Sequence, residues 1–256
     1  MDIVQSIFLG LIEGITEFLP ISSTGHLIVA SEWLGVAQTE TNKAFEVIIQ
    51  LASILAVVTQ YKQRFHPKHL SLWLKVALAF LPIATVGFLF RHQIKTLFSI
   101  EVVPWMFIIG GVVFLLLEKY LKRSPPRVHS LDDISYRQAV AVGFAQIFAL
   151  IPGTSRAGAT MVGALLAGMN RTVSAEFSFL LALPVMVAAA GLEFVSHYND
   201  FLGVRMMPLI VGFITAYLSA WVVMKLFLAF LNRFTLNGFG IYRILFGGVL
   251  LYWLHV

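Results

Sequence analysis

The residues best suited to chemistry lie in one polar stretch near the start of the chain, residues 13–26 (EGITEFLPISSTGH). Glu13 and Glu17 are four residues apart, so on a helix they share one face with Cβ atoms about 6 Å apart. Two ionised carboxylates in an apolar environment repel each other and need a cation or a shared proton. Such oxygen ligands suit Mg²⁺ or Ca²⁺, with a substrate phosphate completing the coordination. We predict both glutamates as metal ligands; a solvated helix face is the alternative, which apolar surroundings disfavour.

Three consecutive hydroxyl residues, Ser22, Ser23 and Thr24, stand where a second short helix is predicted to begin. Hydroxyl residues are good N-caps, so capping alone explains one of them. Three at a helix N-terminus also form an anion site with exposed backbone N–H groups. Alternatively, one of them is a nucleophile with His26 as its general base. Without these neighbours His26 would be interpreted as an ordinary packed histidine.

A second, diverged stretch at residues 152–156 (PGTSR) carries the most informative cation, Arg156. Thr154 and Ser155 repeat the pattern of hydroxyls at a helix start. A planar guanidinium matches phosphate with two parallel hydrogen bonds, so Arg156 is predicted to hold phosphate. The alternative is that Arg156 only neutralises the two glutamates.

Three polar residues inside apolar segments extend the candidate site. Arg243 is predicted as a second phosphate-binding arginine; its alternative is a snorkelling or structurally paired side chain. Glu46 and Gln50 lie one turn apart on a predicted span and are added as binding residues. Carboxylates, arginines and two helix N-termini together describe metal-assisted phosphate chemistry. In an apolar cavity open to the bilayer, this arrangement suits a lipid phosphate or diphosphate.

The composition predicts a membrane protein. Of the 256 residues, 59% are hydrophobic and 12% charged, whereas soluble domains carry roughly 25% charged residues. Apolar runs recur along the whole chain, which predicts an all-α polytopic fold rather than a single anchor. The net charge of +5 is expected to follow the positive-inside rule, and nucleic-acid binding is not expected. Because the chain has no cysteine, disulfides are excluded.

Apolar runs predict six transmembrane helices, at about 44–61, 72–90, 102–118, 175–195, 207–230 and 235–255. Two more segments, 3–34 and 138–170, are interrupted by proline and glycine. Pro20, for example, disfavours helical geometry at the residue before it. We predict both segments as re-entrant helical hairpins, because a helix break at membrane depth is tolerated only inside protein or beside a water-filled cavity.

The two halves of the chain resemble each other. Residues 10–24 resemble residues 143–156, and residues 45–52 echo residues 175–182. Each half holds one hairpin and three crossings, and an odd number of crossings inserts the second copy upside down. Inverted repeats usually place the binding site where they meet. The prediction is one membrane domain, 1–256, with internal repeats at about 1–120 and 135–256 and a cytoplasmic linker at 119–137.

The distribution of Lys and Arg predicts the orientation. The loops at 62–75 and 119–137, with Arg171, Lys225 and Arg233, hold twelve of the eighteen basic residues, and the loops on the opposite side hold four. The richer side is predicted to be cytoplasmic. Both termini and the loops at 35–43, 91–101 and 196–206 then face outward.

The two polar stretches resemble the signature motifs of the undecaprenyl-diphosphate phosphatase family, the bacitracin-resistance family of bacterial inner-membrane enzymes. The matching segments are 13–26, PGTSRAG at 152–158, FEVIIQLAS at 45–53 and IYR at 241–243. Motifs of this length and order, spread over nearly the whole chain, make the resemblance specific. Many members have Ser where this chain has Ala157, which weakens the case for a direct catalytic role at that position.

The resemblance implies removal of the terminal phosphate from undecaprenyl diphosphate, giving undecaprenyl phosphate and inorganic phosphate, with dependence on Mg²⁺ or Ca²⁺. It implies a site open to the periplasmic face of the inner membrane. It also implies that Glu13 and Glu17 bind metal or orient water and that Arg156 holds phosphate. Ser23 or His26 would act as nucleophile or base.

A transporter is the alternative, because inverted repeats are typical of secondary transporters, which could carry a small anion or flip the lipid itself. A transporter would not need the paired glutamates, the hydroxyls, the histidine and the arginine in one constellation, so the phosphatase is preferred. The expected partners are a polyprenyl diphosphate and membrane lipids. A homodimer is compatible with the sequence, which does not set the oligomeric state.

Overall fold

A computed structural model describes the chain except for residues 38, 98–100, 197–198, 200–204 and 256. The helices are α1 (Ile3–Thr16), α2 (Ser23–Trp33), α3 (Glu40–Gln60), α4 (Leu70–Leu89), α5 (Arg91–Thr96), α6 (Val102–Leu121), α7 (Tyr136–Gln146), α8 (Arg156–Leu166), α9 (Arg171–Ser196), α11 (Met206–Leu231) and α12 (Asn237–His255). Short 3₁₀ turns lie at Lys62–Phe65, Pro67–His69, Leu131–Asp133 and Ile147–Leu150. Within the described residues the only β-structure is one isolated bridge.

Five of the described helices are long and apolar enough to cross a membrane: Glu40–Gln60, Pro67–Leu89, Val102–Leu121, Arg171–Leu192 and Met206–Leu231. Each coincides with a predicted span, so an all-helical multi-pass membrane protein is supported. The sixth predicted span, 235–255, is helical as α12 but is not among the five, and it contains the polar residues Asn237 and Arg243. The number of six crossings stays a prediction.

Both interrupted segments fold as two short helices joined by a turn, as predicted. We call residues 17–22, between α1 and α2, the first break and residues 147–155, between α7 and α8, the second break. α1 and α7 each begin with a capping box, in which a cap side chain and a glutamine satisfy each other's backbone N–H groups. Whether the two hairpins are re-entrant in a bilayer stays a prediction.

The two hairpins match each other at an offset of 133 residues. Gln5 Nε2 donates to Leu34 O at 3.0 Å, and Gln138 Nε2 donates to Ala167 O at 2.8 Å. The next residue is in both cases a glycine with positive φ, 64° in the first hairpin and 90° in the second. The hydrogen bonds and the backbone therefore repeat in the same register.

In the sequence comparison of 10–24 with 143–156, Pro20 was set against Pro152, which is one residue out of this register. Ser22 has φ 70° and is the N-cap of α2, and Ser155 has φ 74° and is the N-cap of α8. They are the only non-glycine residues of the described chain with positive φ. The caps are thus the true equivalents, and the residue that corresponds to Ser23 is Arg156 rather than Ser155.

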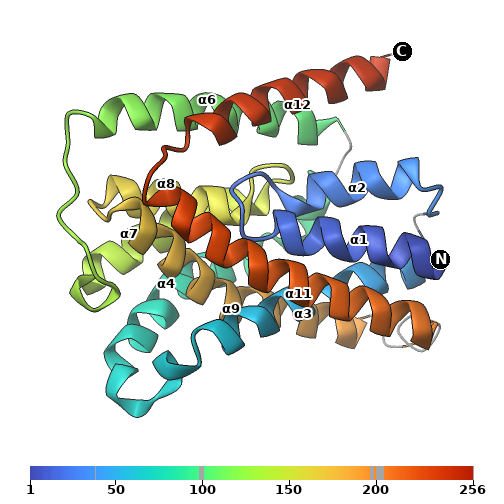
Figure 1. Ribbon diagram of the computed structural model, residues 1–256, viewed down its shortest axis with the longest axis horizontal. Coiled ribbons are helices and arrows are strands. Elements are labelled where there is room, and N and C mark those ends of the chain that lie inside the picture. Colours follow the sequence, from blue (N-terminus) through green and yellow to red (C-terminus); the bar gives the residue numbers. More distant parts are fainter. Residues whose placement is uncertain (38, 98–100, 197–198, 200–204, 256) are drawn as a thin grey trace.

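The helix pairs of the two halves also correspond. α1 packs on α11 and α7 on α4, while α3 packs on α11 and α9 on α4. Two further pairs each join a helix to its equivalent in the other half: α3 with α9, and α6 with α12. α6 and α12 lie side by side at the top of Figure 1. Gly10 and Gly143 allow equally close approaches in the two halves, since a Cβ there would lie 2.5 Å from Gly212 O and from Ala79 O respectively. Exchanging the halves therefore reproduces the main pairings.

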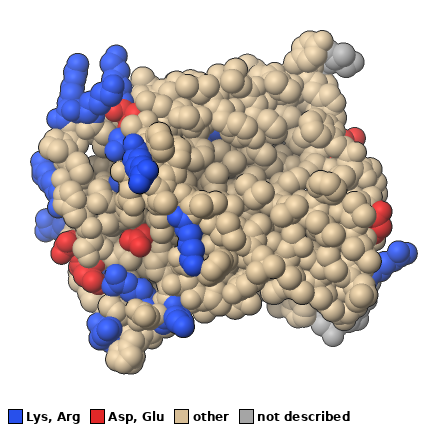
Figure 2. Space-filling model, viewed as in Figure 1, with Lys and Arg blue, Asp and Glu red and all other residues tan. Residues whose placement is uncertain are grey.

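Basic side chains gather at one end of the molecule. Figure 2 shows most of the visible Lys and Arg at the end where the 62–69 turns and the 122–135 connection lie in Figure 1. This asymmetry agrees with the predicted separation of basic and less basic loops. Parts of the predicted outward loops at 91–101 and 196–206 lie outside the described residues, and which end is cytoplasmic stays a prediction.

Candidate active site at the two helix breaks

Glu17 lies at the centre of the candidate site, in the first break, with 7% of its surface exposed. Its Oε2 accepts a hydrogen bond of 2.5 Å from Ser23 Oγ. Its Oε1 accepts one of 3.1 Å from Arg156 Nη2. Ser23 and Arg156 are the first residues of α2 and α8. One carboxylate thus joins the starts of the two equivalent helices. Glu17 and Arg156 are 139 residues apart in the chain.

Glu13 lies one turn before Glu17 and is fully buried. Neither of its carboxylate oxygens forms a well-aligned hydrogen bond with a described residue, and the hydroxyl of Ser53, which interacts with Glu13, forms none elsewhere in the described chain. Glu17, Glu46 and Arg156 are its charged neighbours. A buried carboxylate without hydrogen bonds is costly, so this group requires a proton or a cation.

The carboxylates fit a divalent cation only when another ligand is supplied. Within the described residues no group of three or more His, Cys, Asp or Glu is arranged to hold a metal ion. Glu13 has two unengaged oxygens, whereas both oxygens of Glu17 already accept hydrogen bonds. Mg²⁺ is commonly bound by one or two carboxylates together with substrate phosphate. The donor set present here matches that mode, with Glu13 as the main ligand.

Arg156 is held by one edge of its guanidinium group. Nη1 donates to Ser178 O at 3.0 Å and Nη2 to Glu17, while Nε is buried and has no partner among the described residues. Thr154 Oγ1, two residues earlier, is also buried and has no partner in the described part of the chain. Ser155 is occupied differently, because its Oγ accepts from Gly158 N at 3.0 Å and caps α8. The start of α8 therefore carries two unsatisfied donors, which a bound anion would satisfy.

The start of α2 is less completely capped. The Ser22 side chain makes no capping hydrogen bond, so it leaves backbone N–H groups of the first turn of α2 free for another acceptor. Ser22 and Ser23 are buried and Thr24 is half-buried. Positive φ at Ser22 and Ser155 is strained for residues with a Cβ, and such strain is typical of functional sites. Both helix starts thus combine backbone strain with available donors.

His26 does not contact Ser23 in the way the sequence suggested. Its Nδ1 lies 2.7 Å from Ser22 O, and a carbonyl oxygen only accepts, so Nδ1 carries a hydrogen. Nε2 therefore accepts from Tyr242 Oη, at 2.6 Å. The imidazole also stacks on Phe246, with ring centroids 4.6 Å apart. The Ser23 hydroxyl donates to Glu17, and the role of His26 as base for Ser23 stays a prediction.

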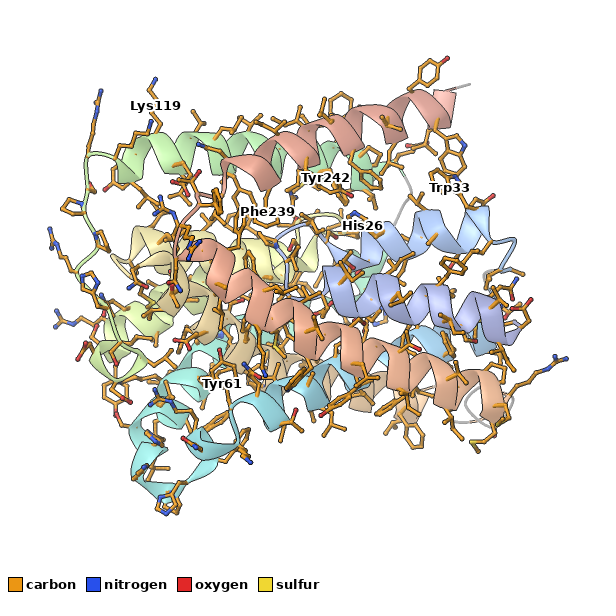
Figure 3. The ribbon with its side chains drawn as sticks, in the orientation of Figure 1. His26, Trp33, Tyr61, Lys119, Phe239 and Tyr242 are labelled. Carbon is orange, nitrogen blue, oxygen red and sulfur yellow. The ribbon has the colours of Figure 1, made fainter. Side chains whose placement is uncertain are left out.

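Tyr242 is a residue of this region that the sequence reasoning did not single out. It lies on α12 beside His26, as Figure 3 shows. The sequence signals were its place in the IYR segment at 241–243 and its position next to Arg243, inside an apolar segment. A tyrosine in such a segment is usually interpreted as an interfacial anchor, and only the fold shows that its hydroxyl reaches the histidine.

Arg243 is not placed as the predicted phosphate clamp. Its guanidinium donates to the backbone oxygens of Pro20, Met106, Phe107 and Gly153, at 2.9–3.4 Å. The side chain is fully buried, and a guanidinium group in an apolar interior must find acceptors. The N–H groups of Arg243 that were predicted to bind phosphate donate to backbone carbonyls instead.

Glu46 and Gln50 lie at the edge of the site. Glu46 Oε1 accepts from Ser31 Oγ at 3.1 Å and so links α3 to α2. Its carboxyl group is a charged neighbour of Glu13, and its role in binding stays a prediction. Gln50 is half-buried one turn further along α3. Neither residue belongs to the hydrogen-bonded group around Glu17.

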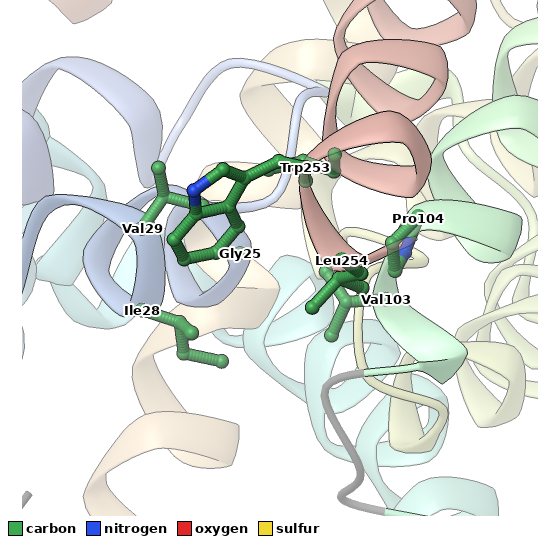
Figure 4. A pocket seen from close by; sticks show the side chains of 8 residues that line it. Gly25, Ile28, Val29, Val103, Pro104, Trp253 and Leu254 are labelled. Carbon is green, nitrogen blue, oxygen red and sulfur yellow. The ribbon is translucent and has the colours of Figure 1, made fainter. Parts of the chain in front are cut away.

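An apolar pocket opens beside the first turn of α2 (Figure 4). It is lined by residues of α2, α6 and α12: Gly25, Ile28, Val29, Val103, Pro104, Leu250, Trp253 and Leu254. Gly25, two residues after Ser23, packs tightly at its base, since a Cβ there would lie 2.5 Å from the Phe107 ring. The lining suits hydrocarbon and not a phosphate group.

Comparison with known proteins identifies the family. The model of the family described as "Bacitracin resistance protein BacA" matches residues 6–249. A relative from Sulfurovum sp. (strain NBC37-1), named "Undecaprenyl-diphosphatase", is 57% identical over 98% of this chain and 99% of its own length. Relatives from Pseudoalteromonas translucida ("Undecaprenyl-diphosphatase 2") and Methanococcus aeolicus ("Undecaprenyl-diphosphatase") are 56% and 47% identical, each over 98% of both chains. The chain therefore belongs to the bacitracin resistance protein BacA family.

Proposed function

We propose that the protein is an undecaprenyl-diphosphate phosphatase. It hydrolyses the terminal phosphate of undecaprenyl diphosphate, releases inorganic phosphate, and so recycles the carrier lipid of cell-wall synthesis and confers bacitracin resistance. The observation that carries this proposal is the joining of Ser23 and Arg156 by Glu17 at two helix starts. The relatives named undecaprenyl-diphosphatase support the substrate.

The first step that we propose is attack by Ser23. Its Oγ forms a bond to the terminal phosphorus while its proton passes to Glu17, the group to which it already donates at 2.5 Å. The bond from that phosphorus to the bridging oxygen breaks, and undecaprenyl phosphate leaves with the electron pair. Arg156 moves its unengaged donors onto the phosphoryl oxygens and stabilises their growing charge, together with N–H groups of α2.

The second step returns the enzyme to its starting state. After Glu17 has given its proton to the departing undecaprenyl phosphate, it takes a proton from a water molecule that attacks the phosphoserine. The bond between phosphorus and Ser23 Oγ breaks, Glu17 passes the proton from that water to the serine oxygen, and inorganic phosphate is released. The competing mechanism is direct attack by a water that Glu17 activates, with no covalent intermediate.

A divalent cation, Mg²⁺ or Ca²⁺, is proposed as cofactor; Glu13 would be its main ligand and Glu17 a second one. When bound, it neutralises phosphate charge and polarises the phosphoryl oxygens. The isoprenoid chain of the bound substrate is proposed to extend from the site past the apolar pocket beside Gly25, because the residues that line this pocket are apolar.

Replacing Glu13 with glutamine is expected to raise the apparent Kd for Mg²⁺ at least about tenfold. Mutating a residue that only hydrogen-bonds to a metal ligand already weakens metal binding by about that factor. The measurement is Mn²⁺ binding by electron paramagnetic resonance in the presence of substrate, together with turnover against Mg²⁺ concentration. Glu32→Gln, which changes an exposed carboxylate, is the matched control. Unchanged metal binding by the Glu13 variant would remove Glu13 from the metal site.

The membrane arrangement is also proposed. The repeated hydrogen bonds, repeated caps and corresponding helix pairs support two inverted repeats within one membrane domain. The grouping of basic residues supports a cytoplasmic linker and a site that opens to the periplasmic face of the inner membrane, with both termini outside.

The deciding experiment is phosphate release from undecaprenyl diphosphate by the purified protein in detergent, where no transport across a membrane takes place. Steady release that requires a divalent cation is expected. A protein that releases no phosphate in detergent, but moves lipid across reconstituted vesicles, would instead be the transporter or flippase that inverted repeats also allow.

A further inference from the structure

Arg243 of α12 is fully buried and contacts four backbone carbonyls. Nη1 donates to Pro20 O at 3.0 Å, and Nη2 donates to Met106 O and Gly153 O, both at 2.9 Å. Nε donates to Phe107 O at 3.4 Å. Its charge faces carbonyl dipoles and no carboxylate of the described chain lies among its partners.

The carbonyls that Arg243 holds come from three separate parts of the fold. Pro20 belongs to the first break, Gly153 to the second break, and the other two to α6. Pro20 stands three residues before Ser23, and Gly153 stands three residues before Arg156. One side chain therefore fixes both breaks at matching distances from the two residues that meet at Glu17.

The surroundings are shaped to hold this cation. The guanidinium carbon lies 5.2 Å from the Phe107 ring centre and 5.6 Å from that of Phe114, both within the range of cation–π attraction. Gly110 leaves the room, because a Cβ there would fall onto the guanidinium group. With four hydrogen bonds and two rings holding it, the guanidinium has no alternative position close by.

We propose that Arg243 is a positioning residue that holds the two breaks together so that Ser23 and Arg156 converge on Glu17; this rests on the phosphatase function proposed above. Arg243 itself touches no substrate. Displacing reacting groups by about 1 Å can cost a factor of about 10² in rate. The effect of losing Arg243 is therefore expected in kcat, with KM changed little.

The test compares three variants in detergent. Gly110→Ala pushes the guanidinium aside without changing any charge, and Arg243→Lys keeps the charge but loses the planar fork that reaches three segments. Both are expected to lower kcat about 10²-fold. Gly248→Ala is the control, since an added Cβ at this exposed position of α12 meets no atom within 4 Å, and it is expected to keep wild-type turnover.

Hydrogen exchange gives a readout that is independent of activity. Peptides covering residues 17–22 and 147–155 are expected to exchange faster together in Gly110→Ala and Arg243→Lys, while peptides of α9 and α11 keep wild-type rates. A variant that is merely destabilised would exchange faster everywhere. If Gly110→Ala does not fold, Arg243→Lys alone carries the test.

The two proposals fail in different ways. Wild-type protein that releases no phosphate would refute the phosphatase function, and the exchange data would still report on the breaks. Active wild-type protein, together with a lysine variant of normal kcat and unchanged exchange at both breaks, would overturn the positioning role. Faster exchange at only one break would also overturn it, because the proposal requires the breaks to loosen together.

Discussion

Replacing Arg156 with lysine is expected to lower kcat by about 10²–10³-fold, the loss typical of removing one preorganised donor from a developing charge. Lysine keeps the positive charge, but its single ammonium nitrogen cannot take the separate positions from which Nη1 donates to Ser178 O, Nη2 donates to Glu17 and Nε is left for phosphate. The measurement is phosphate release under saturating substrate. Arg64→Lys, at a partly exposed ion pair with Asp132, is the control and should behave like wild type.

The alanine variant of Arg156 separates catalysis from stability. Without the guanidinium, Glu17 would be left as a buried charge, and breaking such a pair costs about 3–5 kcal/mol. Arg156→Ala should therefore unfold at a lower temperature in detergent, and adding Glu17→Gln should restore much of that loss without restoring turnover. Turnover within a few-fold of wild type in the lysine variant would contradict the role given to Arg156.

Replacing Ser23 with alanine is expected to lower kcat by more than about 10³-fold, because the nucleophile is lost and the remaining groups act only through binding and electrostatics. Folding should be affected little, since the hydroxyl makes one hydrogen bond, to a carboxylate that still pairs with Arg156. Acid quenching of the wild type during turnover, followed by mass spectrometry, should show a phosphate group on Ser23.

Ser174→Ala is the matched control for that experiment. Ser174 is also buried, and its hydroxyl donates only to Asn170 O within the same region of the chain. This variant should turn over normally. A Ser23→Ala enzyme that retains near-normal turnover, with no phosphoserine in the wild type, would favour direct attack by a water that Glu17 activates.

The sequence by itself determined the broad arrangement. Long apolar segments are stable only in a membrane or in a large protein core. The five helices that can span a bilayer therefore coincide with predicted spans. Proline, glycine and consecutive hydroxyls interrupt helices for local steric reasons, so both breaks fall where they were expected. Pairing of Arg156 with the glutamates was the alternative that the sequence offered, and the fold forms such a pair with Glu17.

The tertiary structure alone decided which partner each side chain takes. From the sequence, the acceptor for the Ser23 hydroxyl could be Glu17 or His26. In the fold Ser23 donates to Glu17, while His26 is hydrogen-bonded to Tyr242, which lies 216 residues further along the chain. Arg243 looked like a phosphate ligand because its charge was visible, whereas the carbonyls that satisfy it are not visible in a sequence. Local chemistry limits what a residue can do, but hydrogen-bond partners are set by long-range packing, which only the folded chain provides.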